Sequence, residues 1–154
     1  MRAAVVTVSS SRAQGQGKDV SGSALAELCE RAGLEVSLQV VPDDRTAIAA
    51  TLRRLADEEA VRFVFTTGGT GLTPDDVTPE ATREVIDREA PGFAEAIRAD
   101  SRRHTPLGIL SRGVSGVRGR TLIVNFPGSP KAIDQSWPIL EPTLKHAAES
   151  LERG

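Results

Sequence analysis

The residues best suited to chemistry lie in one glycine-rich segment, Thr67-Gly68-Gly69-Thr70-Gly71. Its closely spaced glycines permit positive φ angles and bring backbone N–H groups near a ligand, as in a nest that binds phosphate. A tight turn that needs glycine for geometry alone explains the segment equally well when it is taken by itself. The segment lacks the Gly-Lys-Ser/Thr ending of a Walker A loop and the Gly-x-Gly-x-x-Gly dinucleotide fingerprint, which disfavours P-loop hydrolysis.

Two aspartates are expected beside this segment. Asp43 ends the preceding strand, and Asp76 follows the last glycine just before a helix start. Carboxylates beside a phosphate nest would repel a polyphosphate unless a divalent cation lies between them, which suggests Mg²⁺ held partly by water and substrate oxygens. The structural alternative is that Asp43-Asp44 caps a helix and that Asp75-Asp76 forms a turn. We prefer that alternative for Asp44 and Asp75, and we favour function for Asp43 and Asp76.

A second phosphate-capable site follows the last expected strand. In the segment 125–130, Gly128 precedes a helix start with Ser129 as N-cap and Pro130 as the first helical residue. A helix N-terminus attracts anions, although the same residues also make an ordinary cap, and both roles can coexist. The loop 15–19 admits two interpretations, a flap that supplies Lys18 to phosphate and a solvated linker, and the linker is the simpler one.

The remaining reactive residue types carry no catalytic signal. His104 has no partner signal, and His146 lies in the expected C-terminal helix. The single cysteine, Cys29, cannot form an internal disulfide and has no Cys or His at metal-ligand spacing, which predicts a reducing, cytoplasmic compartment. Its place on an apolar helix face predicts that it fills the core. Nucleophilic catalysis by the protein is therefore not expected.

Length and composition predict one globular domain. The chain has 154 residues, of which 39% are hydrophobic and 26% charged, and its formal net charge is −2. No apolar run reaches the roughly 20 residues that a membrane helix requires, so no membrane partner is expected. Acidic and basic residues are interspersed and aromatic residues are few, which gives little support for nucleic-acid binding.

Strands and helices are predicted to alternate along the chain. Apolar runs predict strands at 3–8, 34–40, 61–66, 114–117 and 121–126. Helical spacing predicts a helix from Ser21 to a stop at Gly33, and a second after an Asp44 cap. A third is predicted from a Thr78 N-cap to about Glu89, and a fourth from Phe93 to before Pro106. The C-terminal helical segments are predicted to be interrupted at Pro138 and Pro142.

This alternation predicts an α/β fold, a three-layer α/β/α sandwich with a mainly parallel sheet. In such sheets ligands bind beyond the carboxyl ends of the strands. The four unusual polar segments all follow strands and would meet at that edge: 9–12, 43–44, the glycine-rich segment and 125–130. Their coincidence, more than any one of them, predicts a ligand site.

On these motifs the chain resembles the molybdopterin-binding proteins of the MogA/MoaB family, which are related to the G domains of gephyrin and of the plant molybdenum-cofactor enzyme. The resemblance covers nearly the whole chain, so residues 1–154 are expected to form a single molybdopterin-binding domain. Its most specific parts are the glycine-rich segment, 76–82, Pro91-Gly92, 110–112 and 125–130.

The resemblance implies a homotrimer that binds molybdopterin and Mg-ATP, forms adenylylated molybdopterin and pyrophosphate, and hands its product to a separate molybdenum insertase. Asp43 and Asp76 match the family's catalytic aspartates, which would also hold Mg²⁺. The substrate-binding residues expected from the motifs are Ser9, Ser10, Thr67, Gly68, Gly69, Thr70, Gly71, Thr78, Ser111, Pro127, Gly128 and Ser129.

The chain departs from the family pattern at two places. Many enzymes of the MogA branch have Ser-Asp-Arg where this chain has Ser10-Ser11-Arg12, so the contribution of that aspartate is absent. The pair Asp75-Asp76 is similar to the related CinA-type domain. Two alternatives to the adenylyltransferase therefore remain: a non-catalytic, MoaB-like molybdopterin-binding or scaffold protein, and a CinA-like nucleotide hydrolase.

Overall fold

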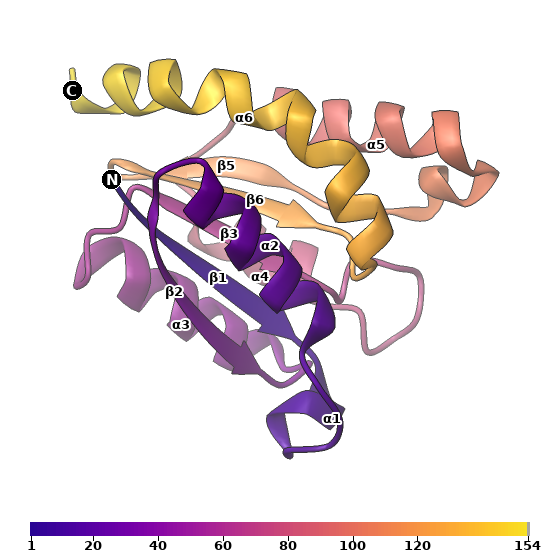
Figure 1. Cartoon of the computed structure of the whole chain (residues 1–154). Coiled ribbons are helices and arrows are strands. Elements are labelled where there is room, and N and C mark those ends of the chain that lie inside the picture. Colours follow the sequence, from indigo (N-terminus) through magenta and orange to yellow (C-terminus); the bar gives the residue numbers. More distant parts are fainter. Residues whose placement is uncertain (154) are drawn as a thin grey trace.

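The computed structural model describes residues 1–153. Their strands form one six-stranded sheet. Its strands run in the order β2-β1-β3-β6-β5-β4 (Figure 1). Their bounds are β1 Arg2–Val8, β2 Glu35–Val41, β3 Phe63–Thr67, β4 Arg88–Glu89, β5 Ser115–Arg118 and β6 Thr121–Phe126. The first four strands in this order pair in parallel, whereas β5 and β4 are antiparallel additions at one edge. The predicted α/β class and the mainly parallel sheet are confirmed.

Helices cover both faces of the sheet, which gives the three predicted layers (Figure 1). On one face lie α2 (Val20–Arg31), α5 (Gly92–His104) and α6 (Pro130–Glu152). On the other lie α3 (Arg45–Asp57) and α4 (Thr78–Val85). Two short helical elements were not predicted: α1 (Ser10–Ala13), in the loop after β1, and the 3₁₀ helix η1 (Pro106–Leu110). The short strand β4 was not predicted either.

The core consists of two apolar clusters, one on each face of the sheet. Strands β1, β3 and β6 contribute to both clusters because alternate side chains point to opposite faces, which explains why their sequences are nearly continuous apolar runs. On the α6 face, Phe65 makes edge-on contacts with Phe126 and Trp137, with ring centroids 5.7 Å apart in each pair. These contacts join the two central strands to α6.

The predicted start and end of α4 were wrong. Val77 is the N-cap, and Thr78 is already helical because its hydroxyl donates to the carbonyl of Gly68 at 3.0 Å instead of capping the helix. The helix ends at Val85, not near Glu89, because Arg88–Glu89 pairs as β4 with β5. In both places a tertiary hydrogen bond replaces the local one that the sequence favoured.

The predicted interruption of the C-terminal helix was also wrong, since α6 runs without a break from Pro130 to Glu152. Each proline removes one backbone N–H and bends a helix without necessarily ending it. Pro138 and Pro142 both lie on the exposed side, where water can pair with the carbonyls they leave without a donor. Figure 1 shows the resulting bend, which lets the buried residues Trp137, Leu140 and Leu144 follow the sheet.

Among residues 1–153, no helix combines the length and the apolar character needed to span a membrane.

The predicted core position of Cys29 is confirmed, because its side chain is fully buried on α2. Burial disfavours the thiolate and raises the pKa of Cys29 to about 12. Only the thiolate reacts with disulfide reagents. We therefore expect the native protein to react negligibly with Ellman's reagent at pH 8, and to release one equivalent of thionitrobenzoate after denaturation. Rapid reaction of the folded protein would show that the thiol is accessible.

Candidate active site

Three loops meet at the carboxyl edge of the parallel strands. The loop after β3 contacts both the end of β1 and the loop after β6: a Cβ at Gly68 would lie 2.5 Å from the Val8 carbonyl oxygen, and a Cβ at Gly128 would lie 3.4 Å from the Gly68 Cα. Gly68 and Gly69 also have positive φ angles of 97° and 69°. The glycine-rich turn therefore needs glycine both for its conformation and for its close packing.

Threonine hydroxyls hold this turn from both sides. Thr67 donates from Oγ1 to the carbonyl of Pro127 at 2.7 Å, and Thr78 donates from Oγ1 to the carbonyl of Gly68. Thr70 is buried, and its carbonyl accepts from the Arg112 N–H at 2.8 Å. In this arrangement the Thr67 and Thr78 hydroxyls each have an intramolecular acceptor, so contact between these two hydroxyls and a substrate stays a prediction.

Asp43 lies beside the turn and is held by the loop after β1. Its Oδ2 accepts from the N–H and the hydroxyl of Ser10, at 3.0 and 3.1 Å, and its own N–H donates to the Ser10 hydroxyl at 3.0 Å. Its other oxygen, Oδ1, would lie 3.4 Å from a Cβ on Gly69. Ser10 and Asp43, which are far apart in sequence, are thus brought together as expected. The neighbouring Asp44 caps α3, accepting from the Ala47 N–H at 2.8 Å.

Asp76 lies beside the end of the same turn, at Gly71. Its Oδ2 accepts from the N–H and the hydroxyl of Thr73, at 3.0 and 2.8 Å, and would lie 2.8 Å from a Cβ on Gly71. The two aspartates therefore flank positions 69–71. Each engages Oδ2 and leaves Oδ1 without a hydrogen bond in the described part of the chain.

Asp43 and Asp76 suit Mg²⁺ only in a site where substrate phosphates and water supply the other ligands. Residues 1–153 contain no cluster of three or more Asp, Glu, His or Cys side chains that could hold a metal. Mg²⁺ usually keeps several waters and takes one or two carboxylates together with substrate phosphates. The unengaged Oδ1 atoms of Asp43 and Asp76 fit that pattern, whereas a metal held by the protein alone does not.

A pocket of about 300 Å³ opens beside the first two residues of the turn, Thr67 and Gly68. Its walls come from the ends of β1 and β3 and from the starts of α2 and α6, and they include Ser9, Thr67, Gly68 and Gly128 among the predicted residues. Asp43 and Asp76 do not line it. The predicted residues thus form two neighbouring groups: a pocket group at Thr67 and Gly68, and a carboxylate group beside positions 69–71.

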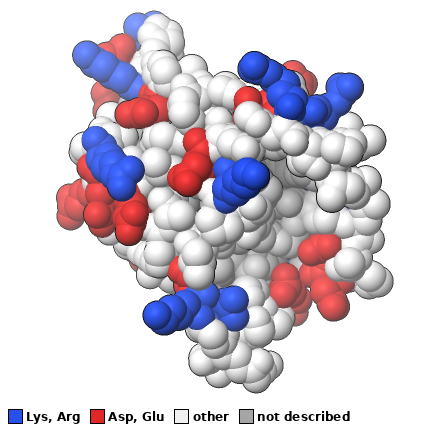
Figure 2. Space-filling model, turned by 45° about the vertical axis from the view of Figure 1, so that its right-hand side comes forward, with Lys and Arg blue, Asp and Glu red and all other residues white. Residues whose placement is uncertain are grey.

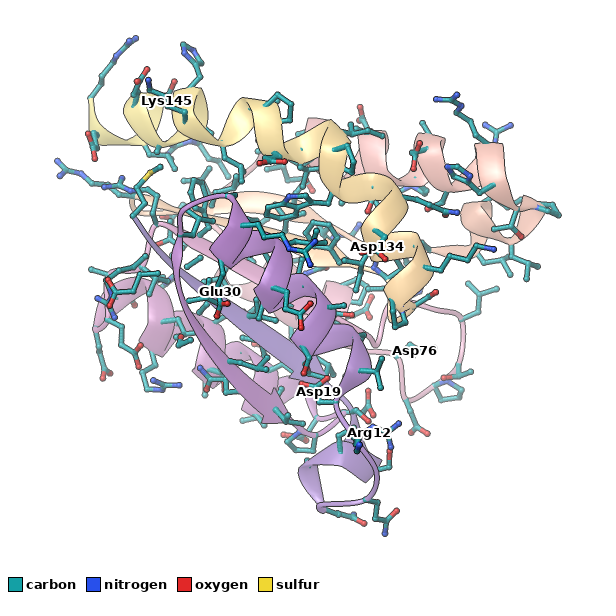
Figure 3. The ribbon with its side chains drawn as sticks, in the orientation of Figure 1. Arg12, Asp19, Glu30, Asp76, Asp134 and Lys145 are labelled. Atoms are coloured by element: carbon teal, nitrogen blue, oxygen red, sulfur yellow. The ribbon has the colours of Figure 1, made fainter. Side chains whose placement is uncertain are left out.

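Four polar residues that line this pocket were not among the predicted site residues: Thr7, Arg12, Asp19 and Ser21. Of these, only Arg12 belongs to a polar segment, 9–12, that was expected at this edge. Asp19 is the N-cap of α2, accepting from the Gly22 N–H at 2.9 Å and from the Thr7 hydroxyl at 2.8 Å. Figure 3 shows Arg12, Asp19 and Asp76 at the same end of the molecule. The available signals were the Asp-x-Ser-Gly helix start at 19–22 and the single arginine after β1. Lys18 does not line this pocket.

Arg112 clamps the far end of the turn. Its Nε donates to the Gly71 carbonyl at 2.8 Å, one terminal nitrogen donates to the Asp76 carbonyl at 2.7 Å, and both terminal nitrogens bind Glu80 at 2.8 and 3.2 Å. The hydrogen bonds from Arg112 lower the pKa of Glu80, and the pKa of Arg112 is raised in return. The clamp thus holds both the backbone of Asp76 and α4.

Ser111 precedes this clamp and does not line the pocket. Its hydroxyl accepts from the Gly113 N–H at 3.3 Å, and its carbonyl accepts from Arg98 at 3.2 Å. Ser129 caps α6, accepting from the Ala132 N–H at 3.4 Å, as predicted. A substrate contact from either serine stays a prediction.

Residues 4–146 match the family model described as "Probable molybdopterin binding domain". The chain belongs to this family. It is 36% identical over 148 residues to a molybdopterin adenylyltransferase of Helicobacter pylori strain J99, an alignment that spans 94% of this chain and 84% of the relative. It is 41% identical over 145 residues to the molybdenum cofactor synthesis protein cinnamon of Drosophila melanogaster, an alignment that spans 93% of this chain but only 24% of that protein.

Solved structures of this molybdopterin-binding family have the same fold. The crystal structure of the molybdopterin biosynthesis enzyme MoaB from Thermus thermophilus superposes with a TM-score of 0.91 at 45% sequence identity. The superposition covers 99% of this chain and 97% of that one.

The Arg112–Glu80 ion pair predicts a pH-dependent contribution to stability. Glu80 has a folded-state pKa lowered from 4.5, so its contribution is complete above that value and is lost as pH falls through the lowered pKa. We expect Glu80→Gln to lower the free energy of unfolding by about 1 kcal/mol at pH 7, since the pair is partly exposed. The difference from wild type should shrink at acidic pH in urea titrations. A difference that does not change with pH would mean that the loss is one of packing and not of charge.

Proposed function

We propose that this chain is a molybdopterin adenylyltransferase, which joins molybdopterin and ATP into adenylylated molybdopterin and releases pyrophosphate. The observation that carries the proposal is the pair Asp43 and Asp76, each with an unengaged carboxylate oxygen beside the same glycine-rich turn. Relatives named for this activity match nearly the whole chain.

The chemistry is one displacement at phosphorus. An oxygen of the terminal phosphate of molybdopterin attacks the α-phosphorus of ATP, a new P–O bond forms, and the bond to the departing pyrophosphate breaks. Mg²⁺, bound by Asp43, Asp76 and phosphate oxygens, would neutralise developing charge. No protein side chain becomes covalently modified, so the protein contributes by positioning and by electrostatic stabilisation.

The two groups of site residues divide this work. The turn and the N-terminus of α6 supply backbone N–H groups and a positive helix end near Gly68 and Gly128, where phosphates would bind. Asp43 and Asp76 lie beside positions 69–71, where they would bind the metal and orient the reacting phosphates. The hydrogen bonds from Ser10 and Thr73 fix the carboxylates in advance, which reduces the reorganisation required during reaction.

We propose that the enzyme is a homotrimer. An apolar groove of about 550 Å³ between α5 and α6 supports subunit contact, because it is lined by Phe93, Val117, Leu122, Pro142 and Leu151. Apolar surface of this kind marks interaction sites. The buried, unpaired Cys29 agrees with a reducing cytoplasm as the site of action. The product would pass to a separate molybdenum insertase.

A direct assay tests the activity. The purified protein is incubated with molybdopterin, ATP and Mg²⁺, and adenylylated molybdopterin and pyrophosphate are measured by chromatography. Both products are expected in equal amounts, and omission of Mg²⁺ should abolish them. Molybdopterin binding without product would support the non-catalytic alternative, and nucleotide hydrolysis without molybdopterin would support the CinA-like one.

The aspartates provide the mutational test. Asp43→Asn and Asp76→Asn keep the side-chain volume but remove the charge that binds the cation, so we expect kcat to fall on the order of a hundredfold or more. Asp75→Asn is the matched control, because Asp75 is exposed, adjacent in sequence, and assigned to the turn. Thermal unfolding should show that all three variants remain folded. A kcat of Asp76→Asn as high as that of the control Asp75→Asn and of wild type would show that Asp76 has no part in the mechanism.

The trimer has its own test. Thr143 lies in the apolar groove. Lys145, which Figure 3 labels on the same helix, does not line it. We expect Thr143→Glu to dissociate the trimer, because a carboxylate would be buried without a partner, and Lys145→Glu to leave it intact. Sedimentation equilibrium measures both masses. A trimer that persists in Thr143→Glu would place the interface elsewhere.

A further inference from the structure

We propose that Arg12 binds a substrate phosphate in the 300 Å³ pocket, and that the loop 14–17 orients its guanidinium for this purpose. The inference rests on the proposed function, because it assigns a residue to the binding of that reaction's phosphorylated substrates. Arg12 would be a binding residue in the pocket, which Asp43 and Asp76 do not line.

Arg12 is the only basic side chain among the described residues that line the pocket. The other charged lining residue, Asp19, already accepts hydrogen bonds from Thr7 and Gly22 and serves as the cap of α2. Its negative charge therefore interacts favourably with the positive N-terminal end of α2. Arg12, in contrast, has no carboxylate within ion-pair distance in the part of the chain that the structure describes. Its positive charge remains available to an anion.

The surroundings of the pocket suit phosphate. Gly68 and Gly128 form one wall, where backbone can approach a ligand closely, and the wall continues into Pro130 at the start of the 23-residue helix α6. A helix start and a guanidinium that face one cavity together favour a phosphate, to which arginine can donate two parallel hydrogen bonds.

Attraction over longer distances contributes little. The formal net charge is −2, and Figure 2 shows basic and acidic side chains interspersed on the face that it draws. Without a large positive field to attract a polyanion, phosphate binding depends on groups in direct contact with it. Arg12 is the basic side chain positioned for that contact.

The loop that follows α1 holds this guanidinium in place. One terminal nitrogen of Arg12 donates to the Gln16 carbonyl at 2.7 Å, and the remaining N–H groups are left for a ligand. Gly17 has a φ of 74°, and a Cβ there would lie 2.2 Å from the same nitrogen and 2.9 Å from the guanidinium carbon. Glycine at position 17 therefore leaves the space that the Arg12 head group occupies.

The first experiment measures the binding of each phosphorylated substrate to the full chain. Dissociation constants for ATP and for molybdopterin are determined separately by calorimetry, in wild type, Arg12→Gln and Arg12→Lys. We expect Arg12→Gln to weaken one of the two substrates about tenfold to a hundredfold, since a charged hydrogen-bond donor is lost. The dissociation constant of Arg12→Lys for that substrate should lie between those of wild type and Arg12→Gln. Lysine keeps the positive charge but cannot donate two parallel hydrogen bonds as arginine does. The substrate that weakens identifies the source of the phosphate.

Lys18→Gln is the matched control. It removes one positive charge from the same loop but from a residue outside the pocket, so both dissociation constants should stay within about twofold of wild type, as expected for an exposed charge. Equal weakening by Lys18→Gln and Arg12→Gln would mean that the effect is one of general charge, and would overturn the proposal. Unchanged binding of both substrates to Arg12→Gln would overturn it as well.

The orienting role of the loop is tested by Gly17→Ala, alone and combined with Arg12→Gln. The new methyl group should displace the guanidinium of Arg12. Gly17→Ala alone should therefore weaken binding of the same substrate at least about fivefold, which is the size expected for the loss of a charged hydrogen bond. In the Arg12→Gln background it should add nothing, because the group that it displaces is already absent. Additive losses would show that Gly17 acts independently of Arg12.

These binding measurements separate failure of this inference from failure of the proposed function. If wild type forms adenylylated molybdopterin and Arg12→Gln binds both substrates normally, only the role of Arg12 is wrong. If wild type binds substrate but forms no product, the adenylyltransferase proposal fails, and the dissociation constants still decide whether Arg12 binds phosphate.

Discussion

Backbone packs directly against backbone where the loop after β3 meets the end of β1, and the geometry of the site depends on that contact. A side chain at Gly68 would collide with the Val8 carbonyl oxygen, whereas a Cβ at Gly128 would make an ordinary van der Waals contact with Gly68. The hydrogen bond from Thr67 to the Pro127 carbonyl closes the same junction. Because the parallel strands fix where these loops begin, a change of a few tenths of an ångström at the junction would be transmitted to both groups of site residues.

The two carboxylates beside this junction are held by separate parts of the fold. Asp43 follows β2 and is fixed by Ser10 from the loop after β1, whereas Asp76 belongs to the loop after β3 and is fixed by Thr73 and by the Arg112 clamp. Two negative charges near one turn repel each other, and these separate hydrogen bonds oppose that repulsion. Each support engages only Oδ2, which leaves the second oxygen free to bind a ligand.

Much of this arrangement could be predicted because it is encoded locally. The strand 121–126 was predicted with its observed bounds, since a strand buried on both faces is mostly apolar. The caps at Asp44 and Ser129 depend on residues one turn away. The errors arose where a distant group competes with a local signal. The local sequence predicts Thr78 as an N-cap, but its hydroxyl donates to the Gly68 carbonyl. It also predicts an interruption at Pro138, although the apolar face of α6 continues past that residue.

Arg112 and Arg12 show why the function of an arginine is hard to read from sequence. Arg112 and Glu80 are 32 residues apart, and their charges compensate each other, so the clamp positions Asp76 while adding little net field to the site. The pKa of Glu80 is lowered, which keeps this pair ionised throughout the pH range in which phosphate esters acquire their second charge, near pH 6. Arg12 is bound to a neutral carbonyl instead, and its charge is not compensated. The two residues are chemically identical, yet one is suited to supporting the loop and the other to binding an anion, because the topology supplies a carboxylate to only one of them.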